Sequence, residues 1–577
     1  MKLPFDLTEE ITIDISEKYN FNKESLEKIG QNKWVKGQWP LVYFIQNEAN
    51  KEAYVGESTN FSIRVKNHLA NPKKSNAFNQ ISIIGSNKFN KSATLDIESK
   101  LIQYISSEGN YNLHNRNDGL INHNYYQQNL YKDIFIEIWE RLKAKKIVTK
   151  SLAEIENSEL FKYSPYKSLN EDQYNSVIQI VKGFTTGKSN RIFIKGSAGT
   201  GKTILATYLI KLLSSDASNT ITDDYSDNEI YEINLIRKFQ EKYPNAKIGI
   251  VIAMTSLRKT LKNVFKSIPD LKASMVINPS ESFKHKYDLL IVDEAHRLRQ
   301  YKNIGWMGAF KNNNRKLGLD DSGNELDWVI ANSKNQIFFY DSAQSIKPSD
   351  IGRNHFDNLL NGENTLNIEL TSQMRVQGDD ANDYITFVDE LLTISRDNTI
   401  FQPDAYDLLV FDSFSEMYKQ LTIKEESYGL ARLISGYSWP WISESNEDVF
   451  DIEIEGLKFK WNSKSKEDWI NSPNAFKEVG SIHTTQGYDL NYGGIIFGRE
   501  ISYNINTNEI EIDREMYFDK YGKQGVGNDD DLKNYLINIY KTIMYRGIKG
   551  TFVYAVDENL RKYFKCHIPT FNKSHFI

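Results

Sequence analysis

Apolar residues between about 190 and 341 are grouped in short runs that alternate with amphipathic stretches of helical spacing. The runs have the length of buried strands: RIFIKG (191–196), IGIVIA (248–253), LLIVDE (289–294) and QIFFYD (336–341). Alternation of strands with helices predicts a parallel sheet with helices on both faces. A second alternating block begins near residue 346 and continues to the C-terminus, so we expect two such α/β domains.

The N-terminal part of the chain has a different pattern. Residues 40–56 consist of two short apolar stretches joined by a polar turn, which predicts a hairpin. Apolar residues at helical spacing follow, and Pro72 is expected to end that helix. Residues 95–105 are amphipathic, and residues 131–150 are typical of a connecting helix. This part is therefore expected to be a small α+β domain followed by a helical linker.

Three stretches interrupt the blocks. Residues 214–232 hold six acidic residues and no basic one, as expected for a solvated insertion, while 302–335 is rich in Asn, Gly and Lys and is expected to be a long loop. In a Trp-rich insertion at 437–470, Trp439 and Trp441 either stack on bases or, as we favour, lie in the core of a β-rich insertion. The expected parts of the chain are 1–130, 131–165, 166–345 and 346–577.

Composition and charge limit the class of protein to which the chain can belong. A chain of 577 residues is too long for one core, and 40% hydrophobic with 25% charged residues is ordinary for globular domains. The net charge of −5 argues against coating of nucleic acid by bulk electrostatics, but residues 61–100 carry seven Lys/Arg against two acids. The one cysteine, Cys566, and the absence of a signal peptide or long apolar run predict a cytoplasmic protein without a membrane span.

A phosphate-binding motif lies between the strand RIFI and the helix ILATYLIKLL. GSAGTGKT matches the pattern G-x-x-x-x-G-K-S/T. Glycines at Gly196, Gly199 and Gly201 would let backbone N–H groups face phosphates, and the helix N-terminus adds positive potential. Lys202 would reach the β- and γ-phosphates, and Thr203 would ligate Mg²⁺.

DLLIVDEAHRL supplies the second half of an ATP site. Asp293 comes at the carboxyl end of an apolar strand, where open α/β sheets bind ligands. Asp293 would hold Mg²⁺ through water, and Glu294 would orient or deprotonate the attacking water. His296 either couples the ATP state to the second domain or caps a helix. Together the two motifs predict a P-loop ATPase that uses ATP and Mg²⁺.

Further segments resemble superfamily 1 helicases and follow in the order of that family. YKSLNEDQ places Gln173 where the family reads the adenine, and FFYDSAQSI places Gln344 where it senses the γ-phosphate. LTSQMRV and YKTIMYRGIKG place Arg375 and Arg546 at the two arginine fingers of the second RecA-like domain. Such arginines stabilise the charge of the phosphoryl group in the transition state of its transfer, so the resemblance implies a motor driven by ATP.

The residues of these motifs resemble those of the Schlafen-related helicase family, in its group 3-like form, and the resemblance covers about 165–577. SQMRV, GYSWPW, IHTTQG and YRGIKGTFVY carry the resemblance. It implies that Gln486 and Gly487 contact ATP and the nucleic-acid backbone. The chain departs from the family at Lys541 and Tyr545, where an Arg and a Thr are usual, which leaves Arg546 in place but puts details of coupling in doubt.

The N-terminal hairpin resembles the GIY-YIG nuclease family over about 38–120. The triplets are LVY and YVG, so Leu-Val-Tyr replaces Gly-Ile-Tyr in the first. Asn112 would hydrogen-bond within the site, with Asn115 and Asn117 as alternatives in the same Asn-rich stretch. The residues that match the family in order are Tyr43, Tyr54, Arg64, His68, Glu98 and Asn112.

Cleavage of a phosphodiester needs a base for water, a cation for the phosphate and a metal for the leaving oxygen. Tyr43, Tyr54 and His68 are all candidates for the base, and the sequence does not choose between them. Arg64 lies four residues before His68, hence on one helix face, and would contact phosphate. Glu98 would be the protein ligand of Mg²⁺, with Mn²⁺ as a possible substitute.

The leading hypothesis is a metal-dependent GIY-YIG endonuclease fused to an ATP-dependent superfamily 1 helicase or translocase. The fold class that follows is α/β: a small α+β domain, then two RecA-like parallel-sheet domains with insertions. The fusion would process nucleic acid, DNA rather than RNA, in repair or anti-phage defence, and a protein partner or oligomer stays open. Two alternatives are a motor with a catalytically silent nucleic-acid-binding N-terminal module, and a nucleotide-sensing ATPase that gates the nuclease without unwinding.

Overall fold

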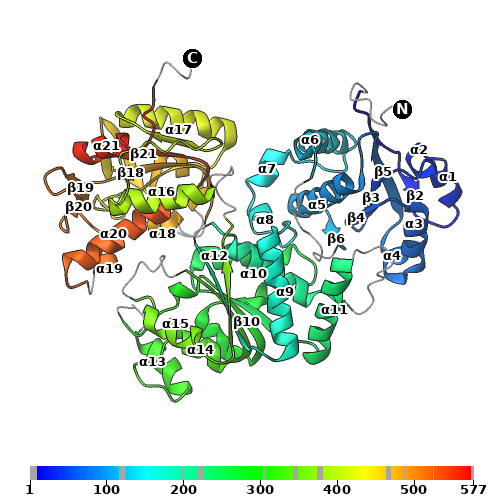
Figure 1. Cartoon of the computed structure of the whole chain (residues 1–577), viewed down its shortest axis with the longest axis horizontal. Helices are drawn as coiled ribbons and strands as arrows, with labels where there is room; N and C mark the ends of the chain where they lie inside the picture. Colours follow the sequence, from blue (N-terminus) through cyan, green and yellow to red (C-terminus); the bar gives the residue numbers. More distant parts are fainter. Residues whose placement is uncertain are drawn as a thin grey trace. The chain divides into compact units, whose positions relative to one another are not determined.

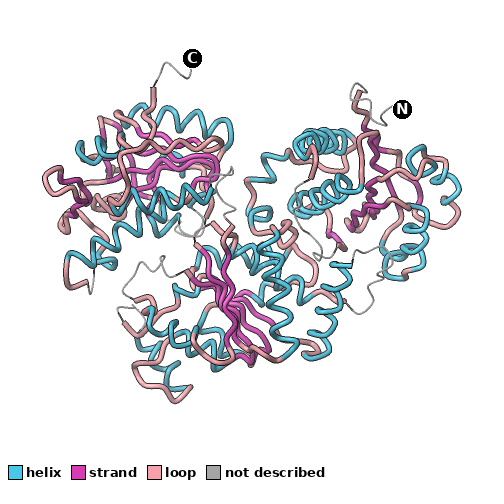
Figure 2. Tube along the Cα trace, in the orientation of Figure 1, coloured by secondary structure: helices cyan, strands magenta, loops and turns pink. Residues whose placement is uncertain are grey.

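The computed structural model divides the chain into two compact units (Figure 1). The first takes in residues 1–186, 203–246 and 261–275, and the second takes in 187–202, 247–260 and 276–577. Figure 2 shows one sheet in the N-terminal part and two further sheets later in the chain. The structure describes residues 10–115, 125–197, 199–217, 227–302, 307–341, 349–372, 381–446, 448–462, 469–485, 488–523 and 526–572.

The sheet of the first unit has the order β1-β5-β3-β4-β6, with β2 also paired to β5. Its centre is the predicted hairpin, and every residue of β3 is buried because helices cover both faces of the sheet. In Figure 1, α5 and α6 lie on one side of it and α1 to α4 on the other. The strands are β1 (Ile13–Ile15), β2 (Tyr19–Asn20), β3 (Leu41–Asn47), β4 (Glu52–Ser58), β5 (Gln80–Ser86) and β6 (Asn112–Leu113).

Pro72 separates two helices of this unit and begins the second one. The first helix ends at Ala70, as expected from the proline, and the Asn71 side chain accepts hydrogen bonds from the backbone N–H groups of Lys73 and Lys74. Proline is favoured in the first turn of a helix because its missing N–H has no partner there. The helices are α1 (Leu26–Gly30), α2 (Lys33–Lys36), α3 (Phe61–Ala70), α4 (Pro72–Ala77), α5 (Lys91–Glu108) and α6 (Gln128–Ala144).

The residues that follow α6 pack onto α5. Tyr104 Oη donates to Glu156 Oε1 at 2.6 Å, and the hydroxyls of Ser99 and Ser168 lie 2.5 Å apart. The Glu108 carboxylate accepts from the N–H and the hydroxyl of Thr149. The linker thus covers one side of the helix that carries Glu98. The helices that follow α6 in the sequence are α7 (Leu152–Glu156), α8 (Glu159–Lys162), α9 (Glu171–Thr186), α10 (Lys202–Ser214), α11 (Asp227–Lys242) and α12 (Thr255–Lys266).

The second unit begins with a parallel sheet of the order β12-β7-β11-β10-β8-β9. The four strands predicted from apolar runs form its centre. β12 joins the same sheet through β7, so this sheet extends past the boundary expected at residue 345. The strands are β7 (Arg191–Gly196), β8 (Ile248–Ile252), β9 (Val276–Ile277), β10 (Tyr287–Asp293), β11 (Ser333–Tyr340) and β12 (Thr365–Leu370).

The expectation of a long loop at 302–335 is wrong. Two helices, α13 (Met307–Lys316) and α14 (Glu325–Ala331), and the start of β11 occupy most of that stretch. Phe310 and Trp328 hold the two helices together, with ring centroids 4.4 Å apart and neither side chain exposed. Two aromatic residues are enough to form a small core, although the surrounding composition is polar.

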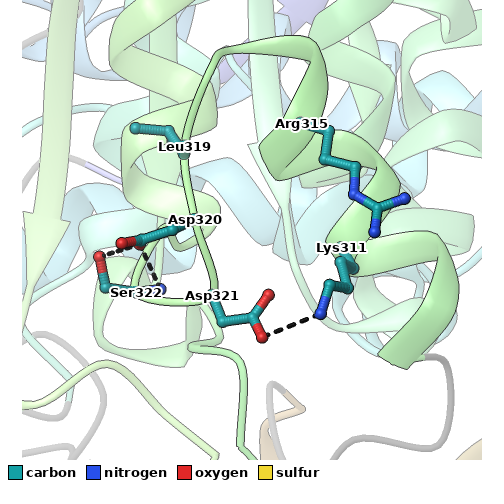
Figure 3. Close-up of a pocket in the computed structure, with 6 residues that line it drawn as sticks. All are labelled: Lys311, Arg315, Leu319, Asp320, Asp321 and Ser322. Atoms are coloured by element: carbon teal, nitrogen blue, oxygen red, sulfur yellow. Dashed lines mark hydrogen bonds and ion pairs between the residues drawn. The ribbon is translucent and has the colours of Figure 1, made fainter.

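The turn between these helices lines a shallow pocket (Figure 3). Asp320 Oδ1 accepts from the N–H and the hydroxyl of Ser322, which closes the turn. Lys311 Nζ lies 3.0 Å from Asp321 Oδ2, as the dashed line in Figure 3 marks. These contacts explain why a stretch rich in polar residues adopts a defined structure.

The last sheet has the order β13-β21-β18-β14-β17-β16-β15, parallel except for the β15–β16 hairpin. A separate hairpin is formed by β19 (Ile501–Asn504) and β20 (Glu509–Ile512). The strands are β13 (Asp407–Val410), β14 (Ala431–Ser435), β15 (Ile452–Ile454), β16 (Leu457–Trp461), β17 (Glu478–Ser481), β18 (Leu490–Phe497) and β21 (Gly547–Ala555). The helices are α15 (Arg353–Leu360), α16 (Ala381–Thr393), α17 (Phe414–Tyr428), α18 (Ile482–Thr485), α19 (Lys520–Lys523), α20 (Asp529–Met544) and α21 (Glu558–Lys565).

The Trp-rich insertion contributes β15 and β16 to this sheet. Trp439 is 5% exposed and its ring packs near that of Trp461, while Trp441 is only partly buried against the same core. The interpretation of Trp439 as a core residue is therefore confirmed. Among the helices described, none is both long enough and apolar enough to cross a membrane.

Glu500 is a buried carboxyl in this part of the chain, and its titration should make stability depend on pH. It is fully buried, Tyr540 Oη donates to it at 2.6 Å, and burial raises its pKa to about 7. A carboxyl with a raised folded-state pKa stabilises the fold at low pH, and this stabilisation is lost as pH rises through about 7. Glu500→Gln should remove this loss, up to about 3 kcal/mol.

The measurement is the difference in melting temperature between about pH 5.5 and about pH 8, which Glu500→Gln should reduce relative to the native chain. The exposed Glu509→Gln is the matched control and should leave the difference unchanged. An identical pH dependence in Glu500→Gln and the native chain would contradict the assignment.

Candidate functional site

Tyr43 lies across the neighbouring strand β4 because Gly56 has no side chain. The two residues are direct partners in the β3–β4 ladder. A Cβ at Gly56 would lie 2.2 Å from both Cζ and Oη of Tyr43, a distance that no packed carbon can occupy. Tyr54 lies two residues before Gly56, hence on the same face, and its ring centroid is 6.3 Å from that of Tyr43. Both tyrosines therefore face α3, where their rings lie near His68.

Helix α3 brings Arg64 and His68 to the Tyr43 hydroxyl. A hydrogen bond of 2.7 Å joins Tyr43 Oη to His68 Nε2, and Arg64 Nε donates to the same oxygen at 3.3 Å. The spacing of four residues puts both side chains on one face of the helix. His68 is only 5% exposed, so its ring is held within the domain rather than on its surface. Four of the predicted residues thus form one cluster.

Lys74 completes the cluster, and sequence reasoning missed it. Its Nζ lies 3.0 Å from His68 Nδ1 and 3.5 Å from the centre of the Tyr54 ring. The lysine comes from α4, beyond Pro72, where the chain turns back toward the site. The only signal for it is a lysine pair just after the proline, which no spacing rule connects to His68.

Glu98 of α5 acts on this cluster through its charge. The carboxylate is partly exposed; beside the larger effect of burial, its negative charge adds to the rise in the pKa of Tyr43 and opposes the fall in the pKa of Lys74. The described residues contain no group of three or more His, Cys, Asp and Glu side chains that could hold a metal ion. One carboxylate with water as the other ligands suits Mg²⁺, which keeps much of its hydration shell in proteins. Glu98 therefore fits the predicted role of a single protein ligand.

Burial and charge shift the three titratable groups at the centre of the cluster. Burial is the main cause that raises the pKa of Tyr43 well above its usual value. Burial, Lys74 and Arg64 lower the pKa of His68 to about 2, so its ring is neutral. Burial and Arg64 also hold the pKa of Lys74 well below that of an ordinary lysine. The environment thus disfavours the charged form of all three groups.

Asn112 is not brought into this cluster. It is exposed on β6, where it pairs with Glu52 at the far end of β4. The alternative Asn115 is buried, and its amide exchanges two hydrogen bonds with the backbone of Val55, beside Tyr54. Asn115 therefore holds the strand of the site in place, while Asn117 lies outside the described residues.

The phosphate-binding loop joins the end of β7 to the start of α10. Gly199 and Gly201 have φ of +86° and +77°, a region that glycine enters without strain. A Cβ at Gly196 would lie 2.5 Å from Thr200 Oγ1, so the tight start of the loop also requires glycine. Thr203 occupies the first turn of α10 and is partly exposed.

Lys202 is 5% exposed and turns back onto its own loop. Its Nζ donates to the carbonyl oxygens of Gly196 at 2.7 Å and Ser197 at 2.8 Å, and lies 3.5 Å from Asp341 Oδ2. A buried ammonium needs acceptors, and phosphate oxygens are stronger acceptors than carbonyls. The loop therefore fits a nucleotide whose phosphates replace these carbonyls as partners of Lys202.

Asp293 and Glu294 follow one another at the end of β10. Asp293 is 1% exposed, and its Oδ1 accepts from the Glu294 N–H at 3.0 Å. Glu294 has φ of +51°, so the chain turns sharply and presents its carboxylate in another direction. Burial alone would raise the pKa of Glu294, but His296 and Lys202 outweigh it and keep that pKa below its usual range. The carboxylate is thus held ionised.

His296 connects the ends of two strands. Its Nδ1 accepts from the Asp341 N–H at 3.3 Å, which leaves the proton of a neutral ring on Nε2. Nε2 lies 2.9 Å from Glu294 Oε2. The ring sits inside the short 3₁₀ helix Ala295–Arg297, so it does not cap that helix. It links Glu294 to the strand that ends at Asp341.

Comparison with known families assigns both halves of the chain. A family model for the Schlafen group 3 DNA/RNA helicase domain matches residues 189–557. The chain belongs to this Schlafen group 3 family. A second model, for the GIY-YIG catalytic domain, matches residues 40–112. The fusion suggested by the motifs is therefore confirmed, together with its α/β fold class.

Relatives of the Schlafen group 3 chain extend to yeast. An uncharacterized protein of Saccharomyces cerevisiae is 26% identical over 405 residues, which cover 64% of this chain and 82% of the yeast protein. Two structures of Bacteroides Pif1 helicase, one with ADP-AlF3 and ssDNA and one bound to ssDNA, cover 65% and 66% of this chain and 91% of their own. Candida albicans Pif1 covers 69% of this chain and 99% of its own. All three are 11% identical to this chain, with TM-scores of 0.24, 0.25 and 0.23.

Two further residues predicted from the helicase-like motifs, Gln173 and Arg546, are buried. Gln173 of α9 is 1% exposed, and it exchanges hydrogen bonds with Asn170 at the start of the helix. Arg546, just after α20, is 4% exposed, and its Nη1 donates to the carbonyl of Tyr488 at 3.4 Å. The other predicted residues lie outside the described part of the chain: Gln344, Arg375, Gln486 and Gly487.

The close approach of Tyr43 to Gly56 generates a prediction. Gly56→Ala should displace the Tyr43 ring and lower the free energy of unfolding of the nuclease domain by about 1–3 kcal/mol, as overpacking of a core does. Urea denaturation is the measurement. Gly30→Ala, where a Cβ meets nothing within 4 Å, is the matched control and should not destabilise the domain. Equal stability of Gly56→Ala and the native chain would contradict the packing described.

Proposed function

We propose that the chain is an ATP-driven superfamily 1 helicase or translocase fused to a metal-dependent GIY-YIG endonuclease that acts on nucleic acid. The observation that carries the nuclease half is the contact of one hydroxyl, Tyr43 Oη, with both His68 and Arg64. A phenol and an imidazole can accept the proton of the attacking water, and a guanidinium can stabilise the charge that develops on the phosphate. We propose DNA rather than RNA as the substrate, in repair or anti-phage defence.

In this proposal Arg64 binds the scissile phosphate and stabilises the charge that develops on it. Tyr43 and His68, which are hydrogen-bonded to each other, accept the proton of the attacking water. Glu98 holds the metal, and a bound Mg²⁺ supplies Lewis-acid stabilisation of the leaving oxygen. The +5 excess over residues 61–100 attracts the backbone of the nucleic acid.

The altered first triplet does not favour a silent N-terminal module. Leu41, which stands in place of the usual glycine, is fully buried in the domain core and pairs with Ser58 at the end of the hairpin. Its side chain strengthens the core, and the tyrosine of the triplet is retained. We therefore prefer an active nuclease to a binding module.

The ATP half of the proposal rests on Lys202, Asp293 and Glu294. Lys202 binds the β- and γ-phosphates, Asp293 and Thr203 hold Mg²⁺, and Glu294 orients the attacking water. His296 keeps the Glu294 carboxylate ionised and oriented, since the ring is itself fixed by the backbone of the next strand. Arg375 and Arg546, the two proposed arginine fingers, respond to the γ-phosphate and turn hydrolysis into motion.

Loss of the proposed metal ligand should separate the two activities. Glu98→Ala is expected to lower metal-dependent cleavage of nucleic acid by at least about 10²-fold, because the phosphate loses its bound cation. ATP hydrolysis should stay at the native rate. The assay compares cleavage of single- and double-stranded DNA and RNA with Mg²⁺ or Mn²⁺.

Asp96→Asn is the matched control on the same helix. Its carboxylate is already engaged by Lys100 and Tyr125, so cleavage should be unchanged. Native cleavage by Glu98→Ala would refute the metal site, and a native chain that cleaves none of these substrates would refute the nuclease itself.

Substitution in the proposed ATP site should reduce ATP hydrolysis. Lys202→Ala should lower nucleic-acid-stimulated ATP hydrolysis by about 10²-fold or more, because the γ-phosphate loses the buried ammonium that stabilises it. Phosphate release is the measurement, and the exposed Lys188→Ala serves as control. Stimulated hydrolysis that persisted in Lys202→Ala would sink the motor assignment, whatever the nuclease does.

A further inference from the structure

An unbroken chain of three titratable groups crosses the nuclease site. It runs from Tyr43 on β3 through His68 on α3 to Lys74 on α4, with distances of 2.7 Å from Tyr43 Oη to His68 Nε2 and 3.0 Å from His68 Nδ1 to Lys74 Nζ. Both ring nitrogens of the histidine are therefore occupied by groups that can exchange a proton. Such an arrangement is a path for a proton from the phenol to the amine.

Within the described part of the nuclease unit, three other groups face this path. Arg64 of α3 donates to Tyr43 Oη and cannot itself take up a proton. The face of the Tyr54 ring on β4 lies against Lys74 Nζ, and Glu98 on α5 acts on both ends through its charge. The neighbouring Lys73 is directed elsewhere and pairs with Asp216 at 3.3 Å.

We propose that Lys74 is the final proton acceptor of a relay that begins at the Tyr43 hydroxyl and passes through His68. The inference rests on the nuclease function proposed above. At rest Lys74 is a neutral amine, the Tyr43 hydroxyl donates to His68 Nε2, and His68 Nδ1–H donates to Lys74 Nζ. Lys74 acts through the other two groups and does not touch the substrate.

The protons balance along the relay. As the water oxygen bonds to phosphorus, its proton passes to Tyr43 Oη, the phenol proton passes to His68 Nε2, and the Nδ1 proton passes to Lys74. The P–O bond to the leaving oxygen breaks, and that oxygen takes a proton from solvent. Lys74 then carries one additional proton as an ammonium and loses it to solvent before the next turnover.

The environment of each group suits its part in the relay. Burial raises the pKa of Tyr43, so the phenol does not ionise without an acceptor beside it. Burial, Lys74 and Arg64 lower the pKa of His68 to about 2, so the ring passes a proton on rather than keeping it. Burial lowers the pKa of Lys74, which favours a neutral amine at rest.

Tyr54 gains a role that its position explains. Its ring centre is 3.5 Å from Lys74 Nζ, where a cation is attracted by the negative face of an aromatic ring. The ammonium formed during the reaction is thus stabilised where it appears, and the charge of Glu98 acts in the same direction. The second tyrosine of the pattern supports the charged end of the relay instead of acting on water.

Two substitutions of Lys74 distinguish a relay from a fixed positive charge. Lys74→Met and Lys74→Arg should both lower kcat for cleavage by about 10²-fold with little change in KM, because neither side chain accepts a proton. Lys28→Met and Lys28→Arg, at an exposed lysine of α1 outside residues 61–100, are the matched controls and should cleave at the native rate. Native kcat should also rise with pH to a plateau that begins well below the pKa of an ordinary lysine, and Lys74→Met should lack this rise.

Cleavage by Lys74→Arg within about threefold of the native rate would overturn the relay, since arginine preserves the charge but not the acceptor. If Lys74→Arg fails to fold, as judged by its melting curve, Lys74→Met decides through its pH profile, and an unchanged rise with pH overturns the proposal. These results are distinct from failure of the nuclease function, in which the native chain itself shows no cleavage and matches Glu98→Ala.

Discussion

The rest of the nuclease site depends on the space that Gly56 leaves empty. Because no Cβ stands there, the Tyr43 ring lies across β4 and its hydroxyl reaches a helix on the same face of the sheet. Arg64 and His68 can meet that hydroxyl only at this depth, and Lys74 meets His68 only because the ring is already fixed by Tyr43. One missing side chain thus determines where four functional groups converge.

A buried histidine organises each of the two sites. His68 lies between a phenol and an amine, and His296 lies between a backbone N–H and the Glu294 carboxylate. In each case a hydrogen bond to one ring nitrogen fixes the ring, so that the second nitrogen is directed at one partner. The chemistry differs, but the same physical device orients the group that acts on water.

Sequence patterns identified the groups that a regular element brings together. Tyr43 and Tyr54 follow from the resemblance of the two hairpin triplets to the GIY-YIG family, and the spacing of four on a helix places Arg64 and His68 on one face. Lys74 could not be found this way, because its contact depends on the turn at Pro72. The choice of Asn115 over Asn112 was hidden for a similar reason, since only the path of the chain after α5 decides which amide meets β4. The helices at 302–335 were missed because their core consists of two aromatic rings in a polar stretch.

The packing of the linker on α5 has a consequence for how the two halves of the chain can be separated. Ser99, next to Glu98, is hydrogen-bonded to Ser168. Tyr104 and Glu108 of the same helix are hydrogen-bonded to Glu156 and Thr149 of the linker. A fragment that ended at residue 130 would lack the residues that pack on α5, so one side of the helix that carries Glu98 would be exposed. Transfer of this domain to another protein would therefore have to include residues 131–170. The smallest transferable segment is thus longer than the catalytic domain.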